Sequence, residues 1–159
     1  MSKSETIHDD AHLDLEELAN RRAEVYLTEQ FQKLISEAEA YVEQIEPDDL
    51  NLNDENILLL DVREPEEFAS GYLRKKNHLT IPRGKLEFVA IKKIHEKYGR
   101  DVPIVTYCFK GPRGLLAAYQ LKKMGFQNVK NLKDGLVNWL ASGRTLKSYF
   151  GEITLVKSK

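Results

Sequence analysis

The chain has 159 residues, of which 42% are hydrophobic and 31% are charged. This length and composition are typical of one globular domain with extensions. A single cysteine excludes an internal disulfide, and no apolar run reaches the ~18 residues that a membrane-spanning helix needs. Residues 1–10 also lack the apolar core of a signal peptide. We therefore expect a cytoplasmic protein with no membrane partner.

The net charge of −1 conceals an uneven distribution along the chain. Residues 1–56 carry 16 acidic and 4 basic side chains, whereas residues 57–159 carry 9 acidic and 20 basic ones. The two parts should attract each other, and the basic part suits an anionic small substrate. Its lysines lie in separate segments without interleaved aromatic residues, which argues against a nucleic-acid partner.

The N-terminal part is predicted to form an amphipathic helix. Asp14, with Glu17 three residues later, is typical of a helix start. Apolar side chains then recur at intervals of three and four, which places them on one stripe. They are Leu27, Phe31, Leu34, Ile35, Ala38, Tyr41, Val42 and Ile45. A lone helix of this kind is marginal in water, so it should either pack on the following domain or pair with its copy in a homodimer. Residues 1–46 are thus an acidic helical extension.

A buried strand is predicted after the polar connector that begins at Glu46. Residues 57–62 are apolar apart from Asp61, as in strands that are covered on both faces of a parallel sheet. Asp61, at the end of this run, is either a turn former or a support for a neighbouring loop. Arg63 is either one half of an ion pair or a substrate contact, and ion pairs are the commoner role.

A short helix over residues 66–71, closed by Gly71, is predicted to follow. The next loop carries Arg74, Lys75 and Lys76. This basic run is either a solvated group of charges or a docking site for a partner, and the first reading is the simpler one.

A second strand is predicted at residues 79–81 and a helix at residues 85–98, which ends before Gly99. Arg83, between them, could project toward an anion site. A metal site is not expected, because the histidines show no ligand spacing with cysteine or acidic residues. They are His8, His12, His78 and His95.

The cysteine, Cys108, lies in a predicted strand-to-helix turn. Residues 102–107 are typical of a buried strand, and residues 115–124 follow helical spacing. Such a turn gathers backbone N–H groups around the thiol, and the helix N-terminus adds a partial positive charge of about half an elementary charge. Lys110 and Arg113 bring two further charges, which should favour the thiolate. We therefore predict a nucleophile, the alternative being a small core residue.

The loop CFKGPRG, Cys108 to Gly114, resembles the active-site loop of rhodanese-type sulfurtransferases, in which Cys is followed by two residues, Gly, one residue and Arg. The runs DVREPEEF, IPRGKLEF and KDGLVNW agree with that family. In this chain Gly114 replaces a small polar residue or Ala, Pro112 removes one N–H from the loop, and Tyr72 replaces a His in a lengthened segment. Trp139, in the last of these runs, should be a core residue.

The alternation of strands and helices predicts an α/β fold with a parallel sheet. The resemblance implies a rhodanese-like domain over residues 47–143, with a central parallel sheet flanked by helices. Residues 144–159 form a C-terminal extension, in which residues 152–156 could add an edge strand or mediate association.

The resemblance further implies a sulfurtransferase that works through a Cys108 persulfide and needs no cofactor. Its donor would be a small sulfur-containing anion such as thiosulfate, and its acceptor cyanide, a small thiol or a protein thiol. The donor would be bound by the loop residues Phe109, Lys110, Gly111, Pro112, Arg113 and Gly114. Asp61 and Arg63 would support the loop, and Arg83 would be a further anion contact.

Two other functions remain open. Related domains include phosphatases and arsenate reductases, but those phosphatases have a longer loop than the four residues between Cys108 and Arg113 here. Noncatalytic rhodanese-like modules act in binding or regulation and usually lack the cysteine. The altered segment around Tyr72, together with Pro112, keeps that reading open, because a fold alone does not fix a function.

Overall fold

The computed structural model describes residues 28–154. The chain divides into two compact units, residues 1–36 and residues 37–159, and the boundary between them falls inside helix α3 (Glu29–Tyr41). The predicted helix start at Asp14 and the end of the predicted C-terminal strand lie outside the described residues.

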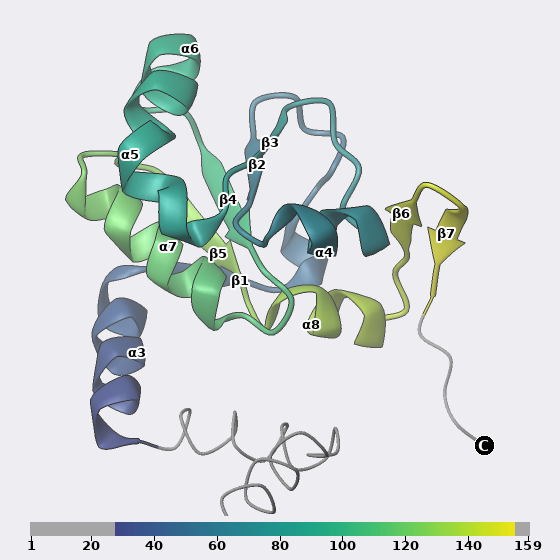
Figure 1. Ribbon diagram of the computed structural model, residues 1–159, viewed down its shortest axis with the longest axis horizontal. Helices are drawn as coiled ribbons and strands as arrows, with labels where there is room; N and C mark the ends of the chain where they lie inside the picture. The colour runs from purple at the N-terminus through teal and green to yellow at the C-terminus, as the bar shows by residue number, and fades with distance from the viewer. Residues whose placement is uncertain (1–27, 155–159) are drawn as a thin grey trace, which may run out of the picture. The chain divides into compact units, whose positions relative to one another are not determined.

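A five-stranded sheet forms the centre of the second unit (Figure 1). Its strands are β1 (Glu43–Ile45), β2 (Leu58–Asp61), β3 (His78–Thr80), β4 (Ile104–Tyr107) and β5 (Val129–Leu132). Their order is β1-β5-β4-β2-β3, and every pairing is parallel. The predicted α/β class and the parallel sheet are confirmed. Asp61 is paired with Tyr107, so β2 and β4 end side by side.

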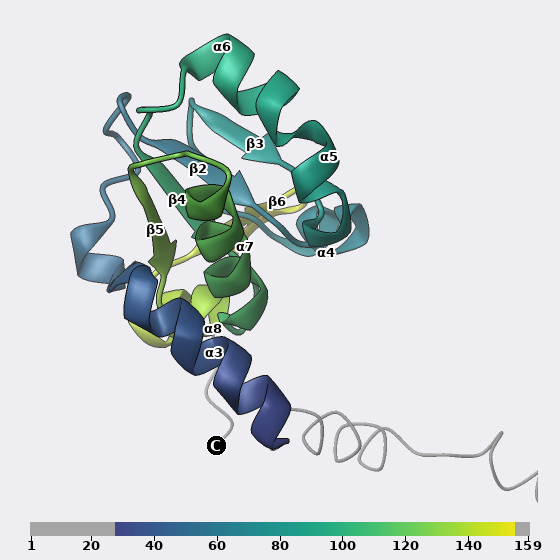
Figure 2. The ribbon, with the colours of Figure 1, turned by 90° about the vertical axis from the view of Figure 1, so that its left-hand side faces the viewer.

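Helices cover both faces of this sheet (Figures 1 and 2). One face carries α5 (Leu86–Ala90) and α7 (Pro112–Lys123), and the other carries α4 (Pro65–Ser70) and α8 (Gly135–Ala141). A π-helical turn, Ile91–His95, joins α5 to α6 (Glu96–Tyr98), and 3₁₀ turns occupy Pro47–Asp49 and Arg83–Lys85. The helical segments predicted at residues 66–71, 85–98 and 115–124 are therefore present.

The core follows from the alternation of side chains along the buried strands β2 and β4. Leu59 and Tyr107 lie on the α8 side, in one apolar cluster with Leu136 and Trp139. Thr106 lies on the α7 side, with its Oγ1 2.8 Å from the carbonyl oxygen of Gly114. The predicted core position of Trp139 is confirmed, since its side chain is buried and its Nε1–H donates to the carbonyl oxygen of Thr145 at 2.9 Å.

The prediction for the N-terminal helix is wrong at its C-terminal end. The helix stops at Tyr41, and Glu43–Ile45 add strand β1 to the sheet edge beside β5. Val42 and Ile45 are buried as their apolar pattern requires, but a pattern of two apolar residues three apart does not distinguish a helix from the entry to a short strand. Ala38 is buried, and Tyr41 stacks on Tyr119 of α7.

The C-terminal residues form a separate hairpin, with β6 (Leu146–Ser148) antiparallel to β7 (Gly151–Ile153). The predicted edge strand thus pairs with β6 and not with the central sheet. Tyr72 and Lys147 exchange two backbone hydrogen bonds, of 2.8 and 2.9 Å, which tie β6 to the segment after α4.

The basic run after α4 is held within the protein only in part, because Arg74 and Lys76 are exposed. Lys75 is buried and its Nζ donates to the carbonyl oxygen of Asp54, while Lys76 forms a 2.9 Å ion pair with Glu55. Burial lowers the pKa of Lys75, and the hydrogen bond from Lys76 lowers the pKa of Glu55. The run therefore fastens this loop to the connector before β2.

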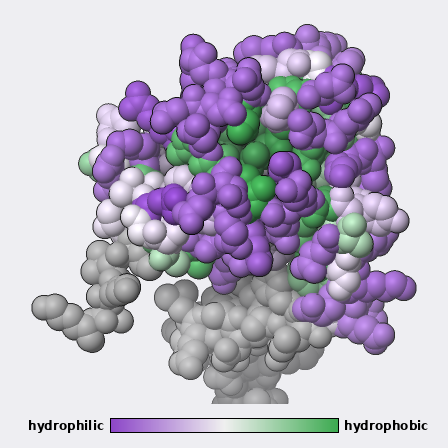
Figure 3. All heavy atoms as spheres, turned by 180° about the vertical axis from the view of Figure 1, so that it is seen from behind, coloured by the Kyte–Doolittle hydropathy of each residue, from purple (hydrophilic) through white to green (hydrophobic). Residues whose placement is uncertain are grey.

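Seen from behind, the surface has hydrophobic residues gathered in its middle and hydrophilic residues around them (Figure 3). No helix among residues 28–154 combines the length and apolar character that crossing a bilayer requires.

Candidate active site

Cys108 follows β4 directly and is 1% exposed. The loop after it turns at Gly111, whose φ of 117° favours glycine. The Gly111 N–H donates to Cys108 Sγ at 3.0 Å. Helix α7 begins at Pro112, where the missing N–H is tolerated because the first turn of a helix has no partner for it. The sulfur thus lies in a strand-to-helix turn, with one backbone N–H directed at it.

Helix α8 holds the cysteine loop from the other side. Its Leu136 N–H donates to the Cys108 carbonyl oxygen at 3.0 Å, and its Val137 N–H donates to that of Phe109 at 3.0 Å. Phe109 and Lys110 are exposed. The loop backbone is therefore fixed at both ends, while two of its side chains remain accessible.

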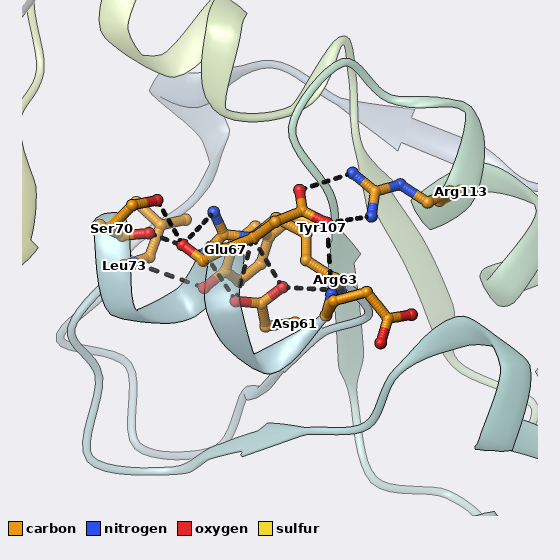
Figure 4. Close-up of polar contacts among 9 residues, drawn as sticks. Asp61, Arg63, Glu67, Ser70, Leu73, Tyr107 and Arg113 are labelled. Carbon is orange, nitrogen blue, oxygen red and sulfur yellow. Dashed lines mark hydrogen bonds and ion pairs between the residues drawn. The ribbon is translucent and has the colours of Figure 1, made fainter. Parts of the chain in front are cut away.

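Arg113, at the start of α7, forms a two-pronged ion pair with Glu67 of α4 (Figure 4). Its Nη1 and Nη2 lie 2.6 and 2.8 Å from the two carboxylate oxygens. Hydrogen bonding to Arg113 lowers the pKa of Glu67. Arg113 therefore brings its charge to the loop together with a carboxylate, so its contribution to the field at the thiol is smaller than the sequence predicted.

A buried ion pair lies at the end of β2 (Figure 4). Arg63 Nε and Nη2 donate to the Asp61 carboxylate at 2.9 and 2.8 Å, and Nη2 also donates to the Gly71 carbonyl oxygen at 2.7 Å. Burial, the largest single cause, would lower the pKa of Arg63, but the hydrogen bond to Asp61 and the nearby negative charges, that of Asp61 first, together raise it. The ion-pair reading of Arg63 is confirmed, although the pair is buried and not on the surface.

This ion pair contacts the residue that precedes the cysteine. The Arg63 guanidinium lies 5.6 Å from the centre of the Tyr107 ring, and the Tyr107 hydroxyl accepts the Leu73 N–H at 3.4 Å. Burial raises the pKa of Tyr107, so its hydroxyl stays protonated. Asp61 and Arg63 thus brace the end of β4, and their support of the loop itself remains a prediction.

A second polar group lies beneath the start of α7. Asn131 Oδ1 lies 3.0 Å from Thr106 Oγ1, and Asn131 Nδ2 donates to Gln44 of β1 at 3.0 Å. A Cβ atom added to Gly114 would lie 2.4 Å from Asn131 Oδ1. The glycine that departs from the family pattern therefore fits the space that Asn131 leaves.

Arg83 and His78 make contacts with residues outside the cysteine loop. Arg83 donates its N–H to the Val62 carbonyl oxygen at 2.9 Å, and its guanidinium pairs with Glu87 at 2.7 Å. His78 stacks on Phe68, and burial lowers the pKa of His78. Within residues 28–154 no group of three or more His, Cys, Asp or Glu side chains is placed to hold a metal ion.

Sequence reasoning missed Glu67 and Asn131, which contact the cysteine loop and the start of α7. Glu67 is 46 residues from Arg113 in the chain, and Asn131 is 25 from Thr106. Pairing an arginine of the loop with the acidic run after Arg63 would have been a usable signal for Glu67, whereas nothing in the local sequence distinguishes Asn131.

Residues 48–142 match the model of the rhodanese-like domain family. A sulfurtransferase of Allochromatium vinosum is 33% identical over 89 residues, which cover 56% of this chain and 77% of that protein. The thiosulfate sulfurtransferase GlpE of Actinobacillus succinogenes is 27% identical over 97 residues, which cover 61% of this chain and 81% of that protein.

The fold is also similar to the solution structure of a polysulfide-sulfur transferase homodimer from Wolinella succinogenes. The TM-score is 0.61 at 28% identity, with 79% of this chain and 88% of that chain covered. The chain spans only 65%, 45% and 28% of the length of three other curated relatives.

Proposed function

The chain belongs to the rhodanese-like domain family, and on that premise we propose that it is a sulfurtransferase that carries sulfur as a Cys108 persulfide. The observation that carries the proposal is the Gly111 N–H, which lies 3.0 Å from Cys108 Sγ in a strand-to-helix turn. A sulfur placed this way receives a backbone hydrogen bond and the positive end of α7. Both stabilise a thiolate and a persulfide anion.

The reaction would proceed in two displacements. Cys108 thiolate attacks the outer sulfur of thiosulfate or a similar donor, the sulfur–sulfur bond of the donor breaks, and sulfite leaves with the electron pair. An acceptor, cyanide or a thiol, then attacks the outer sulfur of the persulfide, and Cys108 thiolate is regenerated. Lys110 is exposed and would attract the anionic donor. Arg113 would attract it less, because its charge is paired with that of Glu67.

Intact-mass measurement tests this proposal. After incubation with thiosulfate and removal of excess donor, the mass of the protein should rise by one sulfur atom. The adduct should disappear on addition of cyanide, with release of thiocyanate. Cys108→Ser is expected to abolish both the adduct and the turnover, because the chain holds no other cysteine. A protein that keeps its mass with thiosulfate, polysulfide and organic persulfides would instead favour a noncatalytic module.

Hydrolysis of aryl phosphates by the same preparation is the matched test for the phosphatase alternative. We expect none, because only four residues, Phe109 to Pro112, separate the cysteine from the arginine. Hydrolysis that disappears in Cys108→Ser would contradict the sulfurtransferase assignment.

A further inference from the structure

A pocket of about 340 Å³ lies beside the cysteine loop, between α4, α8 and the β6–β7 hairpin. Its apolar wall consists of Phe109 of the loop, Leu136 and Leu140 of α8, Leu146 of β6 and Ile153 of β7. We call it the acceptor pocket. Its volume lies at the lower end of the range of small-molecule sites, roughly 300–1,000 Å³.

The polar groups that line the acceptor pocket are already engaged within the protein. Arg63 binds the Asp61 carboxylate and the Gly71 carbonyl oxygen, and Glu67 binds Arg113. The Ser70 hydroxyl donates to the Glu67 carbonyl oxygen at 2.7 Å. A charged ligand would lose its hydration there without gaining a new hydrogen-bonding or ion-pair partner. An apolar group would be removed from water, which is favourable. The lining therefore favours an apolar group over a compact anion such as thiosulfate.

The acceptor pocket and the nucleophile share one rigid segment. Phe109 follows Cys108 in the chain, and Leu136 donates its N–H to the Cys108 carbonyl oxygen at 3.0 Å. Cys108 itself is buried and not part of the lining, so the pocket reaches the cysteine loop through Phe109 and through the turn of α8 that binds the Cys108 backbone. The hairpin wall, Leu146 and Ile153, lies beyond residues 48–142, the part that matches the family. The selectivity it confers would belong to this chain.

We propose that the acceptor pocket binds the hydrocarbon part of an uncharged small aliphatic thiol, which is the sulfur acceptor. This inference rests on the proposed sulfurtransferase function. The thiolate of the acceptor attacks the outer sulfur of the Cys108 persulfide, a new sulfur–sulfur bond forms on the acceptor, and the bond to Cys108 Sγ breaks. The electron pair returns to Cys108 and the acceptor thiol proton goes to water, so no oxidant or reductant is consumed.

The test uses the full chain loaded with sulfur from thiosulfate, and a series of unbranched thiols from ethanethiol to hexanethiol. KM for the thiol should fall by about threefold to fourfold with each added methylene until the pocket is filled. Ile153→Ser should reduce this dependence on chain length. Tyr149→Ser, on the same hairpin but 91% exposed, is the matched control and should retain the full dependence. A KM independent of chain length, or an equal dependence in Ile153→Ser, would overturn the proposal.

Binding of hexyl methyl sulfide, which cannot accept sulfur, separates this proposal from the function beneath it. Calorimetry should detect binding to the wild-type protein and to Cys108→Ser, and weaker binding to Ile153→Ser. If the protein forms no persulfide but binds the sulfide, the sulfurtransferase function is refuted, and the pocket is an apolar binding site without a role in sulfur transfer. A protein that transfers sulfur to cyanide but does not bind the sulfide would refute the acceptor pocket alone. Selective transfer to a protein thiol, with no preference among alkyl thiols, would also contradict it.

Discussion

Gly114 is a residue at which the cysteine loop has little room for a side chain. A Cβ atom there would lie 2.4 Å from Asn131 Oδ1 and 3.2 Å from the backbone of Tyr107. Gly114→Ala should therefore lower the free energy of unfolding by about 1–3 kcal/mol, the usual cost of overpacking a core. It should also slow persulfide formation, because α7 starts from this turn. Urea unfolding and the rate of sulfur uptake from thiosulfate measure the two effects.

A double-mutant cycle with Asn131→Ala identifies which neighbour causes the loss. If Asn131 is responsible, alanine at Gly114 should cost less in the Asn131→Ala background than in the wild type. Strictly additive effects would place the conflict with the Tyr107 backbone. In that case Asn131 would not be the residue that limits the space at Gly114.

Among the elements, the last turns of α3 are held on α7 by contacts that centre on Tyr119. Its ring stacks on Tyr41 with 5.5 Å between centroids, and its hydroxyl donates to Glu37 at 2.9 Å. Tyr119→Ala should raise the hydrogen-exchange rates of the amides of residues 38–45 severalfold and lower the unfolding midpoint slightly. Tyr149→Ala removes an equally large but exposed ring and serves as control.

Unchanged exchange in Tyr119→Ala would mean that the buried side chains of Ala38 and Val42 are sufficient to hold this end of the helix. A homodimer through the N-terminal helix remains a prediction, which size-exclusion chromatography of the same two variants would test.

The elements that could be predicted are those whose sequence pattern is local. Strands β2 and β4 are apolar runs, buried at every position, and the turn at Cys108 is recognisable from its neighbours alone. Strand β1 has only three residues, and its sequence EQI gains its conformation by pairing with β5. Likewise, Glu67 acquires its role from Arg113, far along the chain. Long-range pairing leaves no period or motif in a single sequence, so these features required the structure.

For the molecule as a whole, the uneven charge distribution allows ion pairs between acidic residues of the N-terminal part, residues 1–56, and basic residues of the rest of the chain. Four pairs join the acidic residues 43–55 to the basic part of the chain. They are Glu43–Lys130, Glu46–Lys133, Asp48–Arg144 and Glu55–Lys76. The predicted attraction between the two parts is thus confirmed for this segment, within one chain.

Because these pairs are exposed, salt should weaken them. Raising the NaCl concentration from about 0.02 M to about 0.5 M, which shortens the Debye length severalfold, is expected to lower the urea midpoint by about 0.3 M. Replacing Lys130 and Lys133 by Gln should reduce that salt dependence. A midpoint that rises with NaCl from the lowest concentration would show that like-charge repulsion within each part exceeds the attraction between them.

The position of β1 also constrains the order in which the sheet can form. Glu43 is paired with Lys130, so the ribosome synthesises β1 well before its partner strand β5. A contact between such distant residues carries a high loop-closure entropy, so it forms late and slows folding. Until β5 has been synthesised, Glu43–Ile45 has no partner strand in the sheet. Two of the three residues of this segment are polar. A short polar segment is a poor template for pairing with other nascent chains, so β1 should add little to the aggregation of the unfinished protein.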